Sequence, residues 1–103
     1  KQNIYYPDFR KNCMDTYHLF VIQVKKRNQL KKYLLDNKIE TNIHYPIPIH
    51  KQNFFIKKFK NLSLPNTESQ AKKILSLPIN QYLEKSQILR ICNNINNFYN
   101  NYR

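Results

Sequence analysis

The most informative stretch of this chain reads IETNIHYPIPIH and runs from Ile39 to His50. It begins with alternating apolar and polar residues, which is typical of a half-buried strand. Two prolines follow, and because proline lacks an N–H donor and fixes φ, the strand is predicted to end near Tyr45. His44 and Tyr45 then stand where a strand meets a stiff loop, a place where scaffolds commonly present polar side chains to ligands. The alternative is a plain connection with a surface histidine and a half-buried tyrosine.

Outward from this stretch, hydrophobic periodicity predicts a small α/β domain. Strands are expected at 17–24, 39–45 and 75–79, and helices at 27–37, 50–59 and 84–99. A further short helix is expected to begin at the capping box Thr67-Glu68-Ser69-Gln70, with Asn66 as a competing cap. Residues 1–16 are expected to be irregular. Three strands with helices between and after them suggest a sheet covered on one face.

Length and composition narrow the class of protein. A chain of 103 residues predicts a single domain, 1–103. It contains no apolar run of about 18 residues and its first ten residues do not resemble a signal peptide, so a cytoplasmic protein with no membrane partner is expected. Cys13 lies in a polar stretch, and Cys92 is predicted to be a reduced core residue of the last helix. Glycine is absent, which excludes a glycine-rich phosphate loop.

The formal charge of +12 raises the possibility of a nucleic-acid partner. The cations are scattered in short runs over several predicted helices, such as Lys31-Lys32 and Lys72-Lys73. A stacking platform needs exposed aromatic residues beside clustered cations. Here the phenylalanines, including Phe54, Phe59 and Phe98, fall at apolar positions and are expected in the core. No nucleic-acid partner is therefore expected, and a free-standing basic binding module is kept as the alternative function.

Four motifs, taken in chain order, favour a ligand-binding role for His44 and Tyr45 over a plain connection. They are Tyr17-His18-Leu19-Phe20-Val21-Ile22, then Arg27 with Leu30 and Leu34, then the run from Ile39 to His50, and finally Leu75-Ser76-Leu77-Pro78-Ile79. Together they resemble the C-terminal region of the DegT/DnrJ/EryC1/StrS family, pyridoxal-phosphate-dependent aminotransferases that act on nucleotide-linked keto sugars. The resemblance covers about residues 15 to 98. It departs from the family pattern at Lys38, where a glycine is usual. Either Asn37 takes the left-handed helix cap there, or Lys38 is mildly strained.

The resemblance implies a fold and a division of labour. The fold is the small, mostly antiparallel three-stranded sheet, with helices on one face, of the C-terminal domain of fold-type I pyridoxal-phosphate enzymes. The Schiff-base lysine and the carboxylate that holds the pyridinium belong to a large domain that this chain lacks. We therefore expect no catalytic residue and no cofactor bound by this chain alone, with pyridoxal phosphate present in a complete, homodimeric enzyme of amino-sugar and surface-polysaccharide biosynthesis. The residue that separates aminotransferases from dehydrating family members also lies outside the chain.

The family pattern assigns substrate contacts to His44, Tyr45 and His50. The first two match a His-Tyr pair near the sugar nucleotide, and both side chains can donate hydrogen bonds to phosphate oxygens. His50 matches as well, although it also suits the start of the next helix. His18 is expected to be a core or subunit-interface histidine. The three histidines have no common zinc spacing, so no metal site is expected. A Cys-His nucleophile is equally unsupported.

Overall fold

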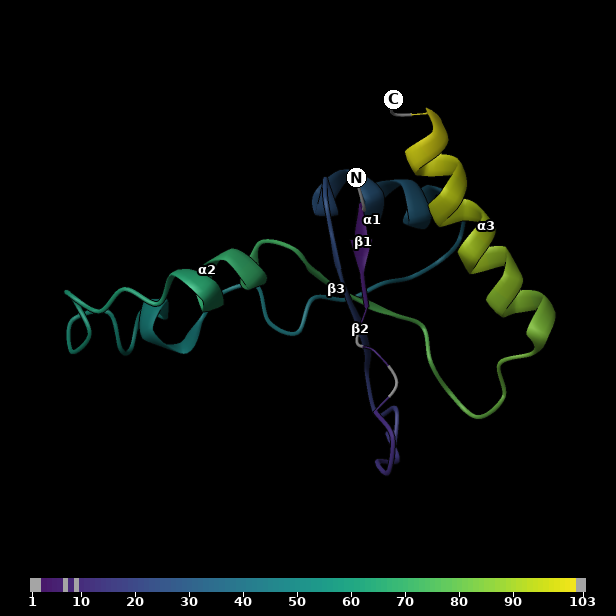
Figure 1. Cartoon of the computed structure of the whole chain (residues 1–103). Helices are drawn as coiled ribbons and strands as arrows, with labels where there is room; N and C mark the ends of the chain where they lie inside the picture. Colours follow the sequence, from purple (N-terminus) through teal and green to yellow (C-terminus); the bar gives the residue numbers. More distant parts are fainter. Residues whose placement is uncertain (1–2, 7, 9, 102–103) are drawn as a thin grey trace.

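In the computed structural model, which describes residues 3–6, 8 and 10–101, short strands and helices form a body from which one long segment projects (Figure 1). The elements in chain order are β1 (Ile4–Tyr5), β2 (Phe20–Val24), α1 (Arg27–Asp36), the 3-10 turn η1 (Ile49–Lys51), α2 (Pro65–Ala71), β3 (Ile74–Leu77) and α3 (Lys85–Asn101). We call residues 46–71 the arm, because Figure 1 shows them extending away from the sheet on the side opposite α3.

Within the described residues, three strands form one antiparallel sheet in the order β1-β2-β3. The central strand β2 pairs with β3 so that Ile22 lies opposite Leu75 and Phe20 lies opposite Leu77. On its other edge, Val24 of β2 lies opposite Ile4. The small antiparallel sheet expected from the sequence is therefore confirmed.

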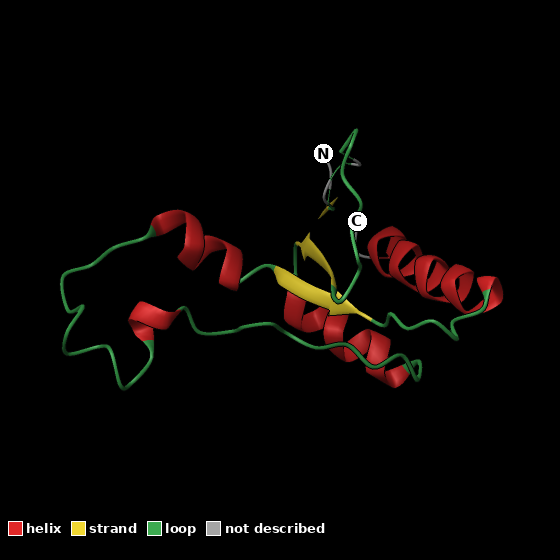
Figure 2. Cartoon of the chain, turned by 90° about the horizontal axis from the view of Figure 1, so that it is seen from below, coloured by secondary structure: helices red, strands yellow, loops and turns green. Residues whose placement is uncertain are grey.

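The core lies on one face of this sheet. Since side chains alternate along a strand, Ile22, Val24 and Leu75 point to the same side. They join apolar residues from α1 and α3 in one buried cluster, completed by Leu30, Leu34, Ile39, Ile91, Ile95 and Phe98. Figure 2 shows α1 running along one side of the sheet, with α3 beside it. The opposite face carries Ser76, whose hydroxyl therefore points away from the apolar core.

The strand predicted at 39–45 is wrong. Only Asn42 pairs with β3, exchanging both backbone hydrogen bonds with Ser76 at 3.1 and 2.7 Å. The chain then leaves the sheet because Pro46 and Pro48 have no N–H to continue a ladder. The third strand of the sheet is instead β1 (Ile4–Tyr5), in a segment that was expected to be irregular. Two residues are too few for a periodic signal.

The helix predicted at 50–59 is also wrong, because only η1 and a series of turns form there. An isolated short helix is marginal unless one of its faces is buried. Phe54, expected in the core, is 87% exposed, so the segment gains no such face. The next helix starts before the predicted capping box: α2 begins at Pro65 with Leu64 as N-cap. Proline is favoured at this first helical position because its missing N–H is not needed.

Cys92 was predicted to be buried, and this is wrong. The buried face of α3 consists of Ile91, Ile95 and Phe98, spaced by four and three residues. Cys92 lies beside this stripe and is exposed. A helical stripe has a narrow centre, so residues at its margin satisfy the periodicity without entering the core.

Helix α1 ends in a Schellman motif that uses a lysine where glycine is favoured. Lys38 has φ 60°, in the left-handed region, whereas Asn37 has φ −91°. The Lys38 N–H donates to the carbonyl of Leu35 at 2.9 Å, and the Ile39 N–H donates to that of Leu34 at 2.8 Å. Of the two alternatives left by the sequence, the strained lysine is the one found.

We therefore expect Lys38→Gly to stabilise the domain. Glycine removes the steric cost of the left-handed conformation, and its greater freedom in the unfolded chain offsets part of that gain, which leaves about 0.5–1 kcal/mol. Lys38→Ala is the control, since alanine keeps the Cβ and should change stability little. The measurement is denaturant unfolding of the chain. A lower midpoint for Lys38→Gly than for Lys38→Ala would contradict the expectation.

Candidate substrate-binding site

His44 lies where the chain leaves the sheet, on the face opposite the core. Its Nδ1 shares a hydrogen bond of 2.8 Å with Oγ of Ser76, which is buried in β3. Because Ser76 neighbours Leu75 on the strand, its side chain must point away from the apolar core and toward His44. When the Ser76 hydroxyl donates to Nδ1, the proton of a neutral imidazole lies on Nε2, which is then a donor.

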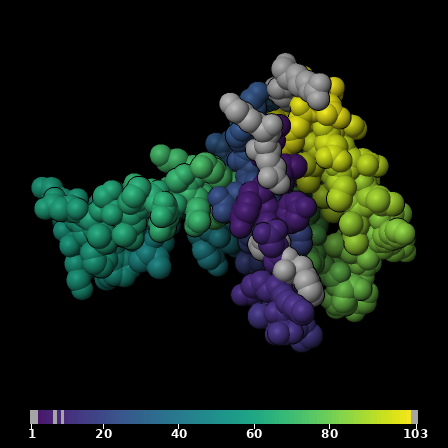
Figure 3. Space-filling view, viewed as in Figure 1, coloured from purple at the N-terminus to yellow at the C-terminus, as the bar shows by residue number. Residues whose placement is uncertain are grey.

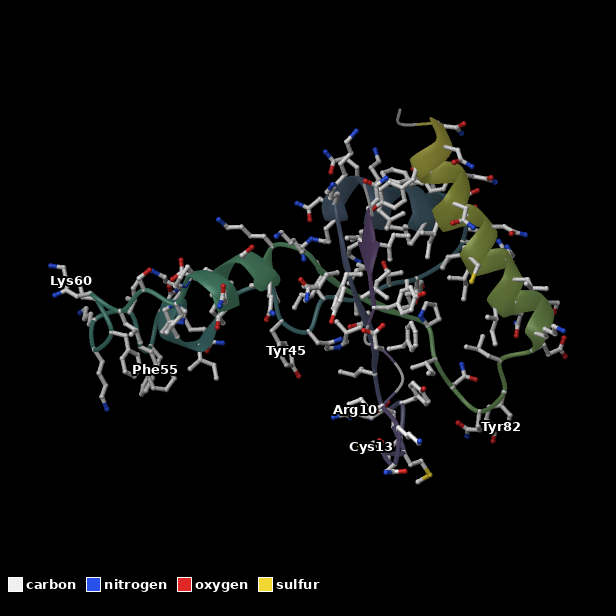
Figure 4. The ribbon with its side chains drawn as sticks, in the orientation of Figure 1. Arg10, Cys13, Tyr45, Phe55, Lys60 and Tyr82 are labelled. Atoms are coloured by element: carbon white, nitrogen blue, oxygen red, sulfur yellow. The ribbon has the colours of Figure 1, made fainter. Side chains whose placement is uncertain are left out.

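Tyr45 follows directly and extends from the segment that leads into the arm (Figure 4). Its side chain is 71% exposed. The rings of His44 and Tyr45 meet edge to face, with centroids 5.4 Å apart and an interplanar angle of 88°. The two predicted residues therefore stand together, one held by the sheet and one open to solvent.

A cavity of about 360 Å³ lies at the base of the arm, between its outgoing and returning limbs. The segment just before the arm supplies His44 and Tyr45, the outgoing limb supplies Gln52, and α2 supplies Thr67 and Gln70. Apolar atoms complete the lining, from Ile47, Pro48, Ile49, Ala71 and Ile74. Among these lining residues there is no lysine, arginine, aspartate or glutamate. The polar groups that the cavity offers are an imidazole, a phenol, a hydroxyl and two amides.

His50 stands apart from this cavity and holds the arm together. It is 5% exposed, and its Nε2 donates to Oε1 of Glu68 in α2 at 3.0 Å. The same carboxylate oxygen accepts the Leu64 N–H at 3.1 Å and lies 3.6 Å from Nζ of Lys51. Glu68 thereby joins the two limbs of the arm. A contact between His50 and ligand stays a prediction.

The surroundings of Glu68 favour its charged form. The hydrogen bond from His50, and after it the backbone N–H of Leu64, lower the pKa of Glu68 to about 2 from its ordinary value of 4.5. A hydrogen bond to a carboxylate stabilises the anion, so proton uptake must compete with it.

His18 occupies a different place from the one expected. It is exposed, so the core alternative is wrong, while the subunit-interface alternative stays a prediction. It lines a second cavity, of about 890 Å³, between the N-terminal segment and β2, together with Tyr5, Tyr17 and the ion pair of Arg10 with Asp15 at 2.9 Å. The linings of this cavity and of the cavity at the arm have no residue in common, so the two are separate.

Sequence reasoning missed Ser76, Gln52, Thr67 and Gln70 as candidate site residues. Ser76 carried a usable signal, because strand alternation places it on the opposite face from Leu75 and Leu77. The two glutamines carried none, since they come together only through the folding of the arm. In the described part of the chain, no three His, Cys, Asp or Glu side chains gather as a metal site would require.

The geometry defines a small sheet domain that offers hydrogen-bonding groups from one edge. The sequence matches the DegT/DnrJ/EryC1/StrS aminotransferase family over residues 2–96, and the chain belongs to this family. This family is pyridoxal-phosphate-dependent. No helix in the described ranges is long and apolar enough to cross a membrane.

Known relatives are much longer than this chain. It is 33% identical, over 92% of its length and 26% of the relative's, to dTDP-3-amino-3,6-dideoxy-alpha-D-galactopyranose transaminase of Aneurinibacillus thermoaerophilus. It is 38% identical, over 73% of its length and 20% of the relative's, to dTDP-3-amino-3,4,6-trideoxy-alpha-D-glucose transaminase of Streptomyces venezuelae. The structure of S. venezuelae DesV in complex with a ketimine intermediate superposes with a TM-score of 0.86 at 32% identity, over 94% of this chain and 26% of that one.

The Glu68 pKa predicts a specific acid sensitivity. Because the folded-state pKa is below the ordinary one, this carboxylate stabilises the fold fully above about pH 4.5, and the stabilisation is lost as pH falls toward about 2. Glu68→Gln should flatten the fall of the thermal midpoint across this window. Glu84→Gln removes the same charge away from His50 and should keep the fall. Equal pH profiles for Glu68→Gln and the parent chain would contradict the assignment.

Proposed function

We propose that this chain, as a single domain over 1–103, is the C-terminal domain of a pyridoxal-phosphate-dependent aminotransferase that acts on nucleotide-linked keto sugars. In this proposal it supplies part of the sugar-nucleotide pocket. The observation that carries the proposal is the cavity at the base of the arm, where His44 is held by Ser76 beside an exposed Tyr45. The enzyme would be a cytoplasmic homodimer of amino-sugar biosynthesis.

The hydrogen bond to Ser76 supports a binding role for His44. A surface histidine without a partner samples several rotamers, whereas this ring has one edge fixed to a buried strand residue. The fold, rather than the ligand, then fixes the direction of its Nε2. Pre-organised donors bind more tightly because less conformational freedom is lost on association.

The uncharged lining of the cavity supports a proposal in which different residues contact different parts of the substrate. The amides of Gln52 and Gln70 and the hydroxyl of Thr67 can each donate and accept, which suits sugar hydroxyls or the edge of a nucleobase. The donors of His44 and Tyr45 suit the oxygens of the diphosphate, which lies between the sugar and the nucleobase in a nucleotide sugar. Phosphate recognition by lysine or arginine must come from elsewhere in a complete enzyme.

The cavity does not fit pyridoxal phosphate. The cofactor needs an amine that forms a Schiff base and a carboxylate at the pyridine nitrogen. Neither group is present among the lining residues. In this proposal the chemistry of amino transfer belongs to the rest of the enzyme, and this domain binds and orients the substrate. Through its hydrogen bond to Glu68, His50 also fixes the arm that shapes the cavity.

A nucleic-acid-binding module is the second candidate, and one observation favours it. Phe54 is exposed and is followed in the sequence by Lys57 and Lys58, so an exposed aromatic residue and cations occur together in this one segment, as a stacking platform requires. The other lysine runs lie on separate elements, in α1 and near β3. The substrate-binding proposal is preferred because it also accounts for the family membership of the chain.

One test of this proposal concerns ligand binding by a complete enzyme that carries this domain. His44→Ala and Tyr45→Phe should each weaken nucleotide-sugar binding roughly 10- to 150-fold, the value of one hydrogen bond to a charged group. Tyr82→Phe is the matched control, because it removes the same hydroxyl from an exposed tyrosine before α3. Isothermal titration provides the measurement. The cofactor's visible spectrum should be unchanged. Normal binding with lower thermal stability would make the pair structural.

Another test concerns this chain by itself. Mixed with pyridoxal phosphate, it should yield no stoichiometric, borohydride-trappable adduct at any single lysine, because no lysine lines the cavity. Peptide mapping after reduction checks this outcome. Scattered, substoichiometric modification of surface lysines is the expected background. One fully modified lysine would show that the chain carries a cofactor site of its own.

A further inference from the structure

Ser76 combines a buried place in the sheet with a polar contact at the cavity. Its side chain is 4% exposed, and its Oγ lies 2.8 Å from Nδ1 of His44. Its backbone exchanges hydrogen bonds of 2.7 and 3.1 Å with that of Asn42. The sheet therefore holds the oxygen in one place, while the hydroxyl hydrogen can still turn about the Cβ–Oγ bond. Such a partner can change from donor to acceptor without any movement of the backbone.

The contact suits both protonation states of His44. In the neutral ring, the Ser76 hydroxyl donates to Nδ1, and Nε2 carries the N–H. In the charged ring both nitrogens are donors, so Nδ1–H donates to Oγ of Ser76 and the hydroxyl hydrogen turns away. A backbone carbonyl at this position would permit only a protonated Nδ1, because it cannot donate. The serine permits both states, and Nε2 remains a donor toward the cavity in each of them.

The surroundings of His44 carry no opposing charge. Among the residues that line the cavity, Tyr45 is the other titratable group, with its ring against the imidazole, and a phenol is neutral in the neutral pH range. Charged groups near the lining are already engaged. Glu68 and Lys51 of the arm pair with each other at 3.6 Å, and Arg27 donates to a carbonyl of β3 at 3.2 Å. Figure 3 shows the arm and α3 on opposite sides of the body, so the charges of α3 lie away from the cavity.

A nucleotide-sugar diphosphate would bring a negative charge on each of its phosphates into these surroundings. The lining contains no lysine or arginine, so His44 is the lining residue that can become a cation. A nearby anion and a hydrogen bond to the charged form both favour protonation of an imidazole. The bond from Nε2 to a phosphate oxygen also becomes stronger when the ring is charged.

We infer that Ser76 is a positioning residue that lets His44 take up a proton from solvent when the diphosphate of a nucleotide sugar binds. The proton is added at Nδ1, where Oγ of Ser76 changes from donor to acceptor, and Nε2–H donates to the diphosphate. Binding of the substrate is thereby coupled to proton uptake. The inference rests on the proposed function, because the proposed function is what places a diphosphate beside His44.

Isothermal titration of the complete enzyme with dTDP-glucose tests the proton uptake. This ligand has no keto group, so it binds without amino transfer, and its diphosphate keeps the same charge throughout the neutral pH range. Titrations at about pH 7.5 in buffers of different ionisation enthalpy should show uptake of about 0.5–1 proton per site, because an ordinary histidine, with a pKa of about 6.5, is mostly neutral there.

Two histidine variants assign this proton. His44→Gln keeps an N–H donor toward the cavity but cannot be protonated, so it should lower the uptake by the amount that His44 supplies. His18→Gln is the matched control, because it removes an exposed histidine that lines the other cavity, and it should keep the uptake of the parent enzyme.

Serine variants test the positioning role. Ser76→Ala removes the acceptor at Nδ1, so it should bind the ligand about 3- to 10-fold more weakly and take up less of the proton. Ser76→Thr restores a hydroxyl and should recover both quantities. Ser86→Ala removes an exposed hydroxyl in α3 and should change neither.

The pH profile separates positioning from a purely structural role. Because binding takes up a proton, the affinity of the parent enzyme should fall as pH rises from about 7 to 9, by up to about tenfold per pH unit. His44→Gln should flatten this fall, and Ser76→Ala should flatten it in part. A structural role of Ser76 alone would weaken binding equally at every pH, and that result overturns the inference.

The same titrations distinguish this inference from the proposed function. If the parent enzyme and His44→Gln bind dTDP-glucose with equal proton uptake, the inference is overturned and the proposed function stands. If the parent enzyme binds neither dTDP-glucose nor UDP-glucose, the proposed function is overturned and the inference falls with it.

Discussion

The pairing of β2 with β3 is the constraint on which the rest of the structure depends. It joins Phe20–Val24 to Ile74–Leu77, so that some fifty residues, including α1 and the whole arm, form one excursion between two hydrogen-bonded strands. Arg27 at the start of α1 reinforces the junction by donating from Nη1 to the carbonyl of Ile74 at 3.2 Å. This register places Leu75 in the core and Ser76 on the opposite face. A slip by one residue would exchange the two.

The residues that pack could be predicted from the sequence, whereas the residues that project could not. Periodicity located β2, β3, α1 and α3 because each buries a face, and burial imposes a repeat. The arm buries little, so no repeat distinguishes its turns from a helix, and the apolar spacing of Phe54, Phe55 and Phe59 indicated a helix that does not form. An exposed phenylalanine looks the same as a buried one in sequence.

The candidate site divides in a similar way. The sequence indicates His44 and Tyr45 as candidates because prolines mark the end of extended structure, a signal local to the chain. Their surroundings required tertiary structure: Ser76 is 32 residues from His44, and Glu68 is 18 residues from His50. No short-range rule connects such pairs. Because glycine is absent, other residues occupy the positive φ values, namely Asn12, Tyr17, Lys26 and Lys38.

The fixing of His44 to β3 has a consequence for motion. Ser76 exchanges backbone hydrogen bonds with Asn42 and neighbours Leu75, which is fully buried. The imidazole is therefore attached to the part of the domain that opens last, whereas Tyr45 and the limb beyond it belong to a part that can open by itself. The wall of the cavity that contains His44 stays in place for as long as the domain is folded. The wall formed by the arm can rearrange many times during that period. If the proposed site is correct, a ligand would enter by movement of the arm while His44 stays in place.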